Sequence, residues 1–189
     1  MSRLAVIVAS TRPGRVALPV AEWFVVAAEE HGGFEVDLVD LAEVDLPFLD
    51  EPHHPRLRQY THQHTKDWSD RIAAADAFVF VTPEYNFGTP AVLKNALDYL
   101  SHEWAHKPAA FVSYGGVSAG TRGVQMTKQV VTTLKMPALV EAVAIPFVAQ
   151  FIDDEGRLQP NDTMTGAAKV MLDELVRQER ALRPLRETA

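Results

Sequence analysis

The run Ala77-Phe78-Val79-Phe80-Val81 decides the fold, because it is apolar throughout and contains no alternating polar residue. A strand with one face in water alternates apolar and polar residues, whereas a strand buried on both faces does not. Four further apolar runs are predicted as strands, at residues 4–8, 34–38, 109–113 and 139–145. Five such strands indicate a parallel sheet that is covered by helices on both sides.

Helical patterns separate these strands along the chain. Apolar residues recur at helical spacing over residues 17–28, and Gly32-Gly33 follows as a helix end. Similar patterns predict helices at about residues 68–75, 91–100, 120–134 and 163–182. Trp23 and Trp68 fall outside the apolar faces of their helices, and exposed aromatic side chains favour contact with another subunit.

Alternating strands and helices with right-handed crossovers predict a doubly wound α/β fold with three layers, formed by a single domain over residues 1–189. The 18 basic and 25 acidic side chains give a formal net charge of −7, which argues against nucleic acid as the main partner. Cysteine is absent, which excludes disulfides, thiolate metal sites and cysteine nucleophiles.

No stretch approaches the ~20 consecutive apolar residues that a membrane-spanning helix needs. The apolar run at residues 4–9 is also too short for a secretory signal and ends in polar residues without a cleavage pattern. We therefore expect a cytoplasmic protein with no membrane partner.

Three loops are predicted to follow strands at one edge of the sheet, where ligands bind in doubly wound folds. Residues 10–17 place hydroxyl groups and two arginines before a helix N-terminus, which favours a phosphate. Residues 82–90 combine aromatic and amide side chains suited to a flat ring, with Thr89 as the expected N-cap of the next helix and Pro90 as its first residue. Residues 113–120 contain paired glycines that let a ligand approach the backbone. Each loop alone is explained equally well as an ordinary polar turn.

Together, the three loops resemble those of the NAD(P)H-dependent FMN reductases of the flavodoxin-like superfamily, a group that includes quinone, azo-dye and chromate reductases. The resemblance extends from residue 4 to about residue 147. Its most specific stretches are Ser10-Thr11-Arg12-Pro13-Gly14-Arg15, Pro83-Glu84-Tyr85-Asn86, Pro90 and Leu93-Lys94-Asn95-Ala96-Leu97-Asp98. Many relatives have a small residue after the phosphate arginine and a serine in place of Gly88, differences that bear on substrate preference. The resemblance implies a flavodoxin-like fold with strand order 2-1-3-4-5 and FMN bound without a covalent link.

The resemblance also assigns the cofactor-binding residues by position. It implies that the phosphate is held by Ser10, Arg12, Arg15, Val16 and Ala17. It implies that the isoalloxazine ring is lined by Pro83, Glu84, Tyr85, Asn86 and Phe87, with its far side supported by Ser113, Gly115 and Gly116. No metal and no catalytic side chain are expected, because the flavin itself does the chemistry.

The implied reaction is a ping-pong transfer of electrons through the flavin. A hydride passes from NADPH or NADH to flavin N5, and a small acceptor such as a flavin, a quinone or an azo compound then takes the electrons. The family also implies a homodimer with each flavin near the subunit interface, and a tetramer is a further possibility.

Two other functions are open at this point: an FMN-binding electron carrier and a redox sensor, both without NAD(P)H turnover. Electron carriers of this fold usually bind phosphate through hydroxyl and amide groups and are strongly acidic. Arg12, Arg15 and the net charge of only −7 therefore favour the enzyme.

The segment 41–64 is long for a loop and contains four of the seven histidines. Its histidines lack regular metal-ligand spacing and have no cysteine nearby, so we expect a solvated or interface loop rather than a metal site.

Overall fold

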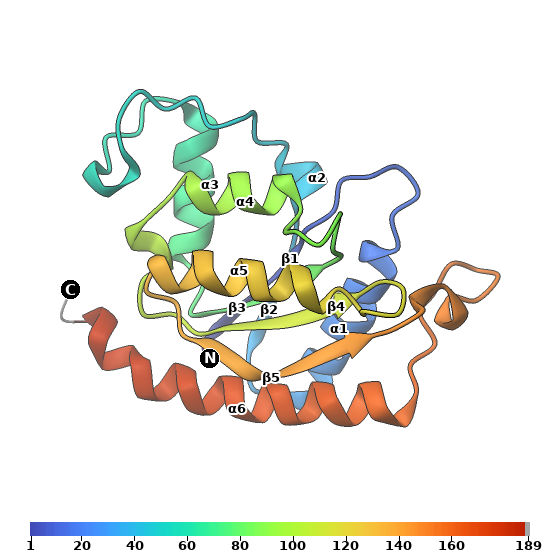
Figure 1. The fold of residues 1–189 in the computed structure, drawn as a ribbon. Coiled ribbons are helices and arrows are strands. Elements are labelled where there is room, and N and C mark those ends of the chain that lie inside the picture. The colour runs from blue at the N-terminus through green and yellow to red at the C-terminus, as the bar shows by residue number, and fades with distance from the viewer. Residues whose placement is uncertain (188–189) are drawn as a thin grey trace.

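A computed structural model describes residues 1–187, in which five parallel strands form one sheet in the order β2-β1-β3-β4-β5 (Figure 1). The strands are β1 (Arg3–Val8), β2 (Glu35–Asp40), β3 (Ala77–Thr82), β4 (Ala109–Tyr114) and β5 (Ala138–Ile145). All four neighbouring pairs are parallel, with a register irregularity between β4 and β5. The predicted doubly wound, flavodoxin-like fold and its strand order are confirmed.

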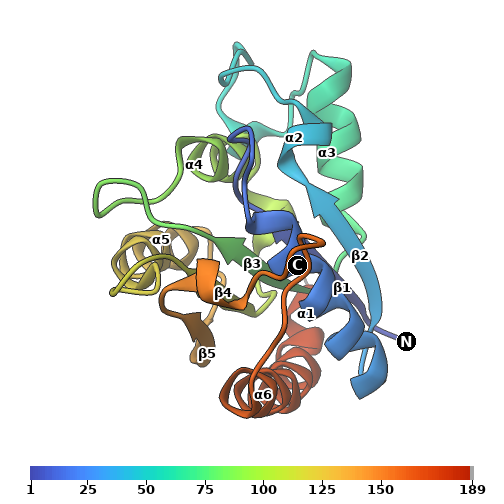
Figure 2. The same cartoon turned by 90° about the vertical axis from the view of Figure 1, so that its right-hand side faces the viewer.

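Helices cover both faces of this sheet, α1 and α6 on one face and α3, α4 and α5 on the other (Figure 2). The α-helices are α1 (Ala17–His31), α2 (Leu41–Val44), α3 (Gln63–Ala73), α4 (Ala91–Asp98), α5 (Thr121–Thr133) and α6 (Asp162–Glu187). Three short 3₁₀ helices are η1 (Pro55–Leu57), η2 (His102–Trp104) and η3 (Val148–Phe151). No helix within residues 1–187 combines the length and the apolar character needed to cross a membrane.

Successive side chains of the central strands enter two different cores, because a strand alternates its side chains between its faces. In β3, the small and β-branched residues Ala77, Val79 and Val81 face α1 and α6. Phe78 and Phe80 face the other helices and stack on one another with ring centroids 6.2 Å apart. Burial on both sides explains why the run has no polar alternation.

Two local predictions are wrong. Trp68 is 2% exposed and donates its indole N–H to the carbonyl of Ala96 at 3.0 Å, so it belongs to the core between α3 and α4 and gives no support for a subunit contact. Thr89 does not cap α4, whose N-cap is Pro90. The Thr89 hydroxyl instead hydrogen-bonds Thr127 of α5 at 2.8 Å, which attaches the loop before α4 to α5.

The segment 41–64 contains α2 and η1, and acidic side chains close it into a compact loop. Glu51 accepts hydrogen bonds from the backbone N–H groups of Thr61 at 2.8 Å and His62 at 3.0 Å. Asp50 accepts from Tyr99 of the α4 C-cap at 3.0 Å, which ties the segment to the helical layer.

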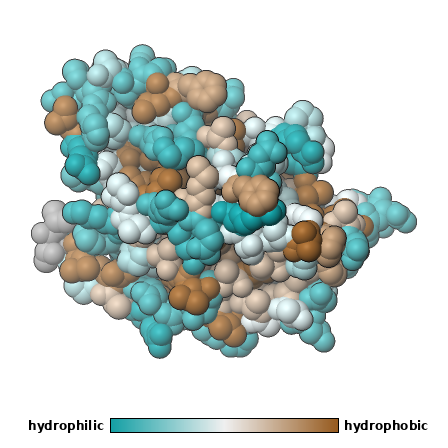
Figure 3. All heavy atoms as spheres, in the orientation of Figure 1, coloured by the Kyte–Doolittle hydropathy of each residue, from teal (hydrophilic) through white to brown (hydrophobic). Residues whose placement is uncertain are grey.

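On the face of the molecule seen in Figure 1, polar and hydrophobic residues are mixed over the surface, with hydrophobic residues exposed at several separate places (Figure 3).

Candidate functional site

The loop after β1 joins the sheet edge to the N-terminus of α1. Ser10 is 1% exposed, and its Oγ lies 2.7 Å from the hydroxyl of Tyr85 in the loop after β3. Gly14 has a φ of 70°, a left-handed conformation that suits glycine. No side chain caps α1 at Val16, so the N–H groups of its first turn are left for an anion.

The two arginines of this loop have different surroundings. Arg15 forms a half-buried ion pair with Asp40, and Asp40 also accepts a hydrogen bond from the N–H of Ala42 at 2.9 Å as the N-cap of α2. Arg12 is exposed, and within residues 1–187 no acidic side chain forms a salt bridge with it. Arg12 is therefore the arginine of this loop whose charge is free for a ligand.

The loop after β3 ends in a tight hairpin. Tyr85 and Gly88 exchange two backbone hydrogen bonds of 3.1 and 2.9 Å, and the two residues between them have positive φ values, 50° at Asn86 and 69° at Phe87. Positive φ at both central residues is the type I′ geometry of a two-residue hairpin, which asparagine tolerates and a large aromatic residue does not favour. The turn carries Phe87 into solvent with 67% of its surface exposed.

The side chain of Glu84 reaches α5. Its Oε1 accepts from Nε of Arg122 at 2.6 Å, and its Oε2 accepts from the backbone N–H of Arg122 at 3.1 Å. The hydrogen bond from Arg122 lowers the pKa of Glu84 and outweighs the effect of burial. The carboxylate therefore attaches the loop to α5, and only the backbone of Glu84 is left to face a ring.

The loop after β4 carries the glycines. Gly115 donates its N–H to Ile145 of β5 at 3.2 Å, and the carbonyl of Gly116 accepts from Phe147 at 3.1 Å. A Cβ added at Gly116 would meet no atom within 4 Å, so its backbone borders open space. The buried Ser113 lies at the C-terminal end of β4, next to this loop.

The three predicted loops lie at one edge of the sheet, on the right-hand side of Figure 1. Ser10 and Tyr85 connect the first two loops directly. Tyr114, at the end of β4, lies beside both residues. Burial and the neighbouring Tyr85 raise the pKa of Tyr114, and a hydrogen bond with Ser10 opposes this rise. The side chains of Glu84 and Arg15 are the members of the predicted set that already have charged partners.

Sequence reasoning missed Asp40, Arg122 and Phe147 at this edge. Asp40 is the last residue of β2 and Phe147 follows β5, and the C-terminal ends of both strands lie at the same edge, so the topology could have indicated them. Arg122 is in the first turn of α5, where no local motif connects it to Glu84.

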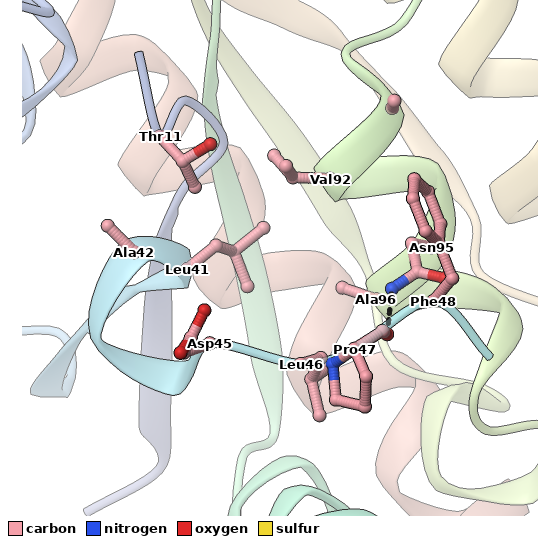
Figure 4. A pocket seen from close by; sticks show the side chains of 11 residues that line it. Thr11, Leu41, Ala42, Asp45, Leu46, Pro47, Phe48, Val92, Asn95 and Ala96 are labelled. Atoms are coloured by element: carbon pink, nitrogen blue, oxygen red, sulfur yellow. Dashed lines mark hydrogen bonds between the residues drawn. The ribbon is translucent and has the colours of Figure 1, made fainter. Parts of the chain in front are cut away.

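A cavity of about 490 Å³ lies beside the first loop, between α2 and α4 (Figure 4). It is lined by Thr11, Leu41, Ala42, Asp45, Leu46, Pro47, Phe48, Ala91, Val92, Asn95 and Ala96. Asn95 holds the wall in place, because it donates to the carbonyl of Pro47 at 2.7 Å and accepts from the N–H of Leu49 at 3.0 Å. The rim residue Phe48 is 83% exposed.

Two of the histidines of segment 41–64, His62 and His64, lie next to Asp50. His64 Nε2 lies 3.0 Å from a carboxylate oxygen of Asp50, and the ring of His62 stacks on that of His64 with centroids 5.2 Å apart. Within residues 1–187, no three His, Cys, Asp or Glu side chains are grouped so that they could hold a metal ion.

Comparison with known proteins identifies the family. Residues 2–150 match the model of the family described as NADPH-dependent FMN reductase. The chain belongs to the NADPH-dependent FMN reductase family. It is 45% identical over 136 residues to an NAD(P)H-dependent FMN reductase of Schizosaccharomyces pombe, covering 71% of this chain and 68% of that protein. It is 36% identical over 113 residues to a probable NADPH:quinone oxidoreductase of Oryza sativa, covering 56% of this chain and 53% of that protein.

A solved structure shows the same fold. The flavoenzyme NAD(P)H:(acceptor) oxidoreductase FerB from Paracoccus denitrificans superposes with a TM-score of 0.77 at 21% identity, over 96% of this chain and 98% of that chain. Membership of the FMN reductase family makes this protein an oxidoreductase that uses FMN and NAD(P)H. The uncapped helix N-terminus, the free charge of Arg12 and the open backbone at Gly116 suit FMN, which carries a phosphate and a flat ring.

Proposed function

We propose that this protein is an FMN-dependent NAD(P)H oxidoreductase that passes electrons to a small acceptor by a ping-pong route. The observation that carries the proposal is the hydrogen bond between Ser10 and Tyr85, 2.7 Å long, which joins an anion-binding loop to an aromatic loop at one sheet edge. FMN has a phosphate and an aromatic ring in one molecule, so a site with both kinds of contact is what it requires.

The phosphate site of this proposal is the first turn of α1 and the loop before it. Ser10, the N–H groups at Val16 and Ala17, and the Arg12 guanidinium hold the phosphate through charge-assisted hydrogen bonds. Arg15 supports the site from behind, where its pairing with Asp40 fixes the loop against α2. This arrangement leaves Arg12 exposed for the ligand and holds Arg15 in place.

The ring site is the edge formed by the loops after β3 and β4. Pro83, the Glu84 backbone, Tyr85, Asn86 and Phe87 line one side of the ring, and Ser113, Gly115 and Gly116 support the other side. When bound, FMN would supply the chemistry that accepts a hydride from NADPH or NADH and passes two electrons to the acceptor. The protein orients the ring and excludes water from part of it, and no side chain has to move a proton.

The apolar cavity between α2 and α4 supports a hydrophobic acceptor such as a quinone. Its walls are mostly aliphatic, and Thr11 places it directly beside the phosphate loop. The match to plant NADPH:quinone oxidoreductases is consistent with this class of acceptor.

A homodimer, with a tetramer as the larger form, and a cytoplasmic location are part of the same proposal. The exposed Phe48 on the rim of the cavity and its exposed neighbour Leu49 support a subunit contact on the α4 side, because a second copy would remove both from water. Reduced nicotinamide nucleotides, the proposed electron donors, are held in the cytoplasm. Sedimentation of the purified protein tests the assembly directly.

Steady-state kinetics test the reaction. Initial rates are measured over a grid of NADPH and benzoquinone concentrations, with FMN-loaded protein. A ping-pong route predicts parallel lines in a double-reciprocal plot, because the oxidised nucleotide leaves before the quinone binds. Intersecting lines would mean that both substrates are bound together and would overturn the proposed route.

A further inference from the structure

The ion pair between Glu84 and Arg122 joins two loops of the candidate site. Glu84 lies in the loop after β3, and Arg122 lies in the first turn of α5, which directly follows the loop after β4. Besides its bonds to Glu84, Arg122 donates through a terminal nitrogen to Ser118 Oγ at 2.9 Å. The Glu84 side chain is only 9% exposed, so both loops are held through a carboxylate that is shielded from water.

The contact between Glu84 and Arg122 is strengthened by its place at the N-terminus of α5. Glu84 accepts from a backbone N–H of the first turn of α5, where the helix dipole favours negative charge. A Cβ added at Gly123 would lie 3.0 Å from both Glu84 Cβ and the carbonyl oxygen of Gly88, so loop and helix are in close contact. The loop after β3 is therefore packed directly against the start of α5.

Arg122 also supports the unfavourable turn at Phe87. The central carbon of its guanidinium group lies 3.6 Å from the centroid of the Phe87 ring, a cation–π contact. This contact offsets part of the cost of an aromatic residue at a φ of 69°. The same cation thus anchors Glu84 and holds the exposed aromatic ring next to Asn86.

We propose that Glu84 and Arg122 form a positioning pair, which fixes the loop after β3 and whose two opposite charges act on the reduction potential of the flavin in opposite directions. This inference rests on the proposed FMN site. A reduced flavin ring carries negative charge that the oxidised ring lacks, so a nearby positive charge favours the reduced form and a nearby negative charge favours the oxidised form. In the intact pair the two effects partly cancel.

The two single variants are expected to shift the reduction potential of bound FMN in opposite directions. Arg122→Gln leaves the charge of Glu84 unbalanced and lowers the potential of bound FMN. Glu84→Gln leaves the charge of Arg122 unbalanced and raises the potential. The double variant returns close to the wild-type value. If the pair served only in packing, both single variants would shift the reduction potential in the same direction.

The experiment is an anaerobic redox titration of FMN-loaded protein, together with a fluorescence measurement of FMN affinity. We expect the ratio of affinities for reduced and oxidised FMN to change roughly tenfold in opposite directions, which for two electrons is about 30 mV each way. Arg122→Lys keeps the charge but loses the stacking and the paired hydrogen bonds, so it weakens FMN binding while the potential stays near wild type. Lys169→Gln and Asp173→Asn on α6 make the same charge changes on the opposite face of the sheet and should leave the potential unchanged.

Shifts of the same sign in Arg122→Gln and Glu84→Gln, or no shift in either, would overturn the inference. If Arg122→Gln does not fold, Glu84→Gln and Arg122→Lys decide the question, because one changes the charge and the other changes the geometry. Wild-type protein that holds FMN but is not reduced by NADPH or NADH contradicts only the proposed function, and the potentials still test the pair. Failure of the wild type to bind FMN overturns both.

Discussion

Arg12 and Arg15 belong to the same loop, but their surroundings differ, which gives them different roles. Both are equivalent in a local motif, since both precede the N-terminus of α1. The carboxylate that pairs with Arg15 comes from Asp40 at the end of β2, a neighbour in space that no local spacing could indicate. The loop composition therefore indicated an anion site, and only the packing shows which arginine is free for the anion.

Arg12→Ala is expected to weaken FMN binding by about 1.5–3 kcal/mol, the range for a hydrogen bond to a charged group. Thermal stability should not change, because Arg12 is exposed and forms no salt bridge within residues 1–187. Quenching of FMN fluorescence measures the affinity, and Arg180→Ala on the exposed side of α6 is the control. Unchanged affinity in Arg12→Ala would remove this residue from the phosphate site.

Arg15→Ala is expected to reduce the free energy of unfolding by about 1–3 kcal/mol, because it leaves the buried carboxylate of Asp40 without its countercharge. Adding Asp40→Asn in the same chain should recover part of this loss. Urea denaturation of the three proteins measures both effects. A fully stable Arg15→Ala variant would show that the pair does not hold the loop.

At the scale of elements, α5 positions the loop after β3 through a close contact at Gly123. Gly123→Ala is expected to displace that loop and weaken FMN binding, because the new Cβ would lie 3.0 Å from the carbonyl oxygen of Gly88. Gly166→Ala in α6 is the matched control: its Cβ meets nothing within 4 Å, so it should gain about 0.5–1 kcal/mol of stability from helix propensity. Equal FMN affinity in the two variants would contradict the role given to α5.

Glu51 closes segment 41–64, and this closure depends on pH. Burial alone would raise the pKa of Glu51, but hydrogen bonds from Thr61 and His62 outweigh it and lower the pKa to about 2. Because the pKa of Glu51 in the folded protein lies below its ordinary value of 4.5, the stabilisation is complete above pH 4.5 and is lost as the pH falls toward 2.

Glu51→Gln should therefore make the amides of Thr61 and His62 exchange with solvent roughly tenfold faster at pH 6, from the loss of about 1.4 kcal/mol of charge-assisted hydrogen bonding. Two-dimensional NMR hydrogen exchange measures this, with the exposed Glu30→Gln as the control. Equal exchange rates in both variants would show that the segment is closed by other contacts.

Long elements could be predicted from the sequence, and short ones could not. The apolar run at β3 and the helical repeat of α1 are local signals that survive in the fold, with ends close to those expected. The helix α2 and the 3₁₀ helix η1 lack such signals, because tertiary contacts stabilise them. Trp68 was misjudged for the same reason: its burial depends on Ala96 of α4, a partner that the helical pattern of α3 does not contain.

At the scale of the whole molecule, the parallel topology of the sheet brings the loops of the site together. Parallel strands end at the same edge, so loops after β1, β3 and β4 converge even though they are far apart in the sequence. This convergence could be predicted from the strand pattern, and the family resemblance supplied the role of each loop. The contacts between loops, such as Ser10 with Tyr85 and Glu84 with Arg122, could not be predicted, because they depend on side-chain directions that only packing fixes.

An anaerobic spectrum of FMN-loaded, desalted protein during addition of NADPH tests the central claim most directly. We predict that the protein retains FMN and that the flavin absorption band bleaches with about one equivalent of nucleotide, because one hydride reduces one flavin. A protein that retains FMN in its oxidised state after both NADPH and NADH have been added would contradict the reductase and favour an electron carrier or a sensor.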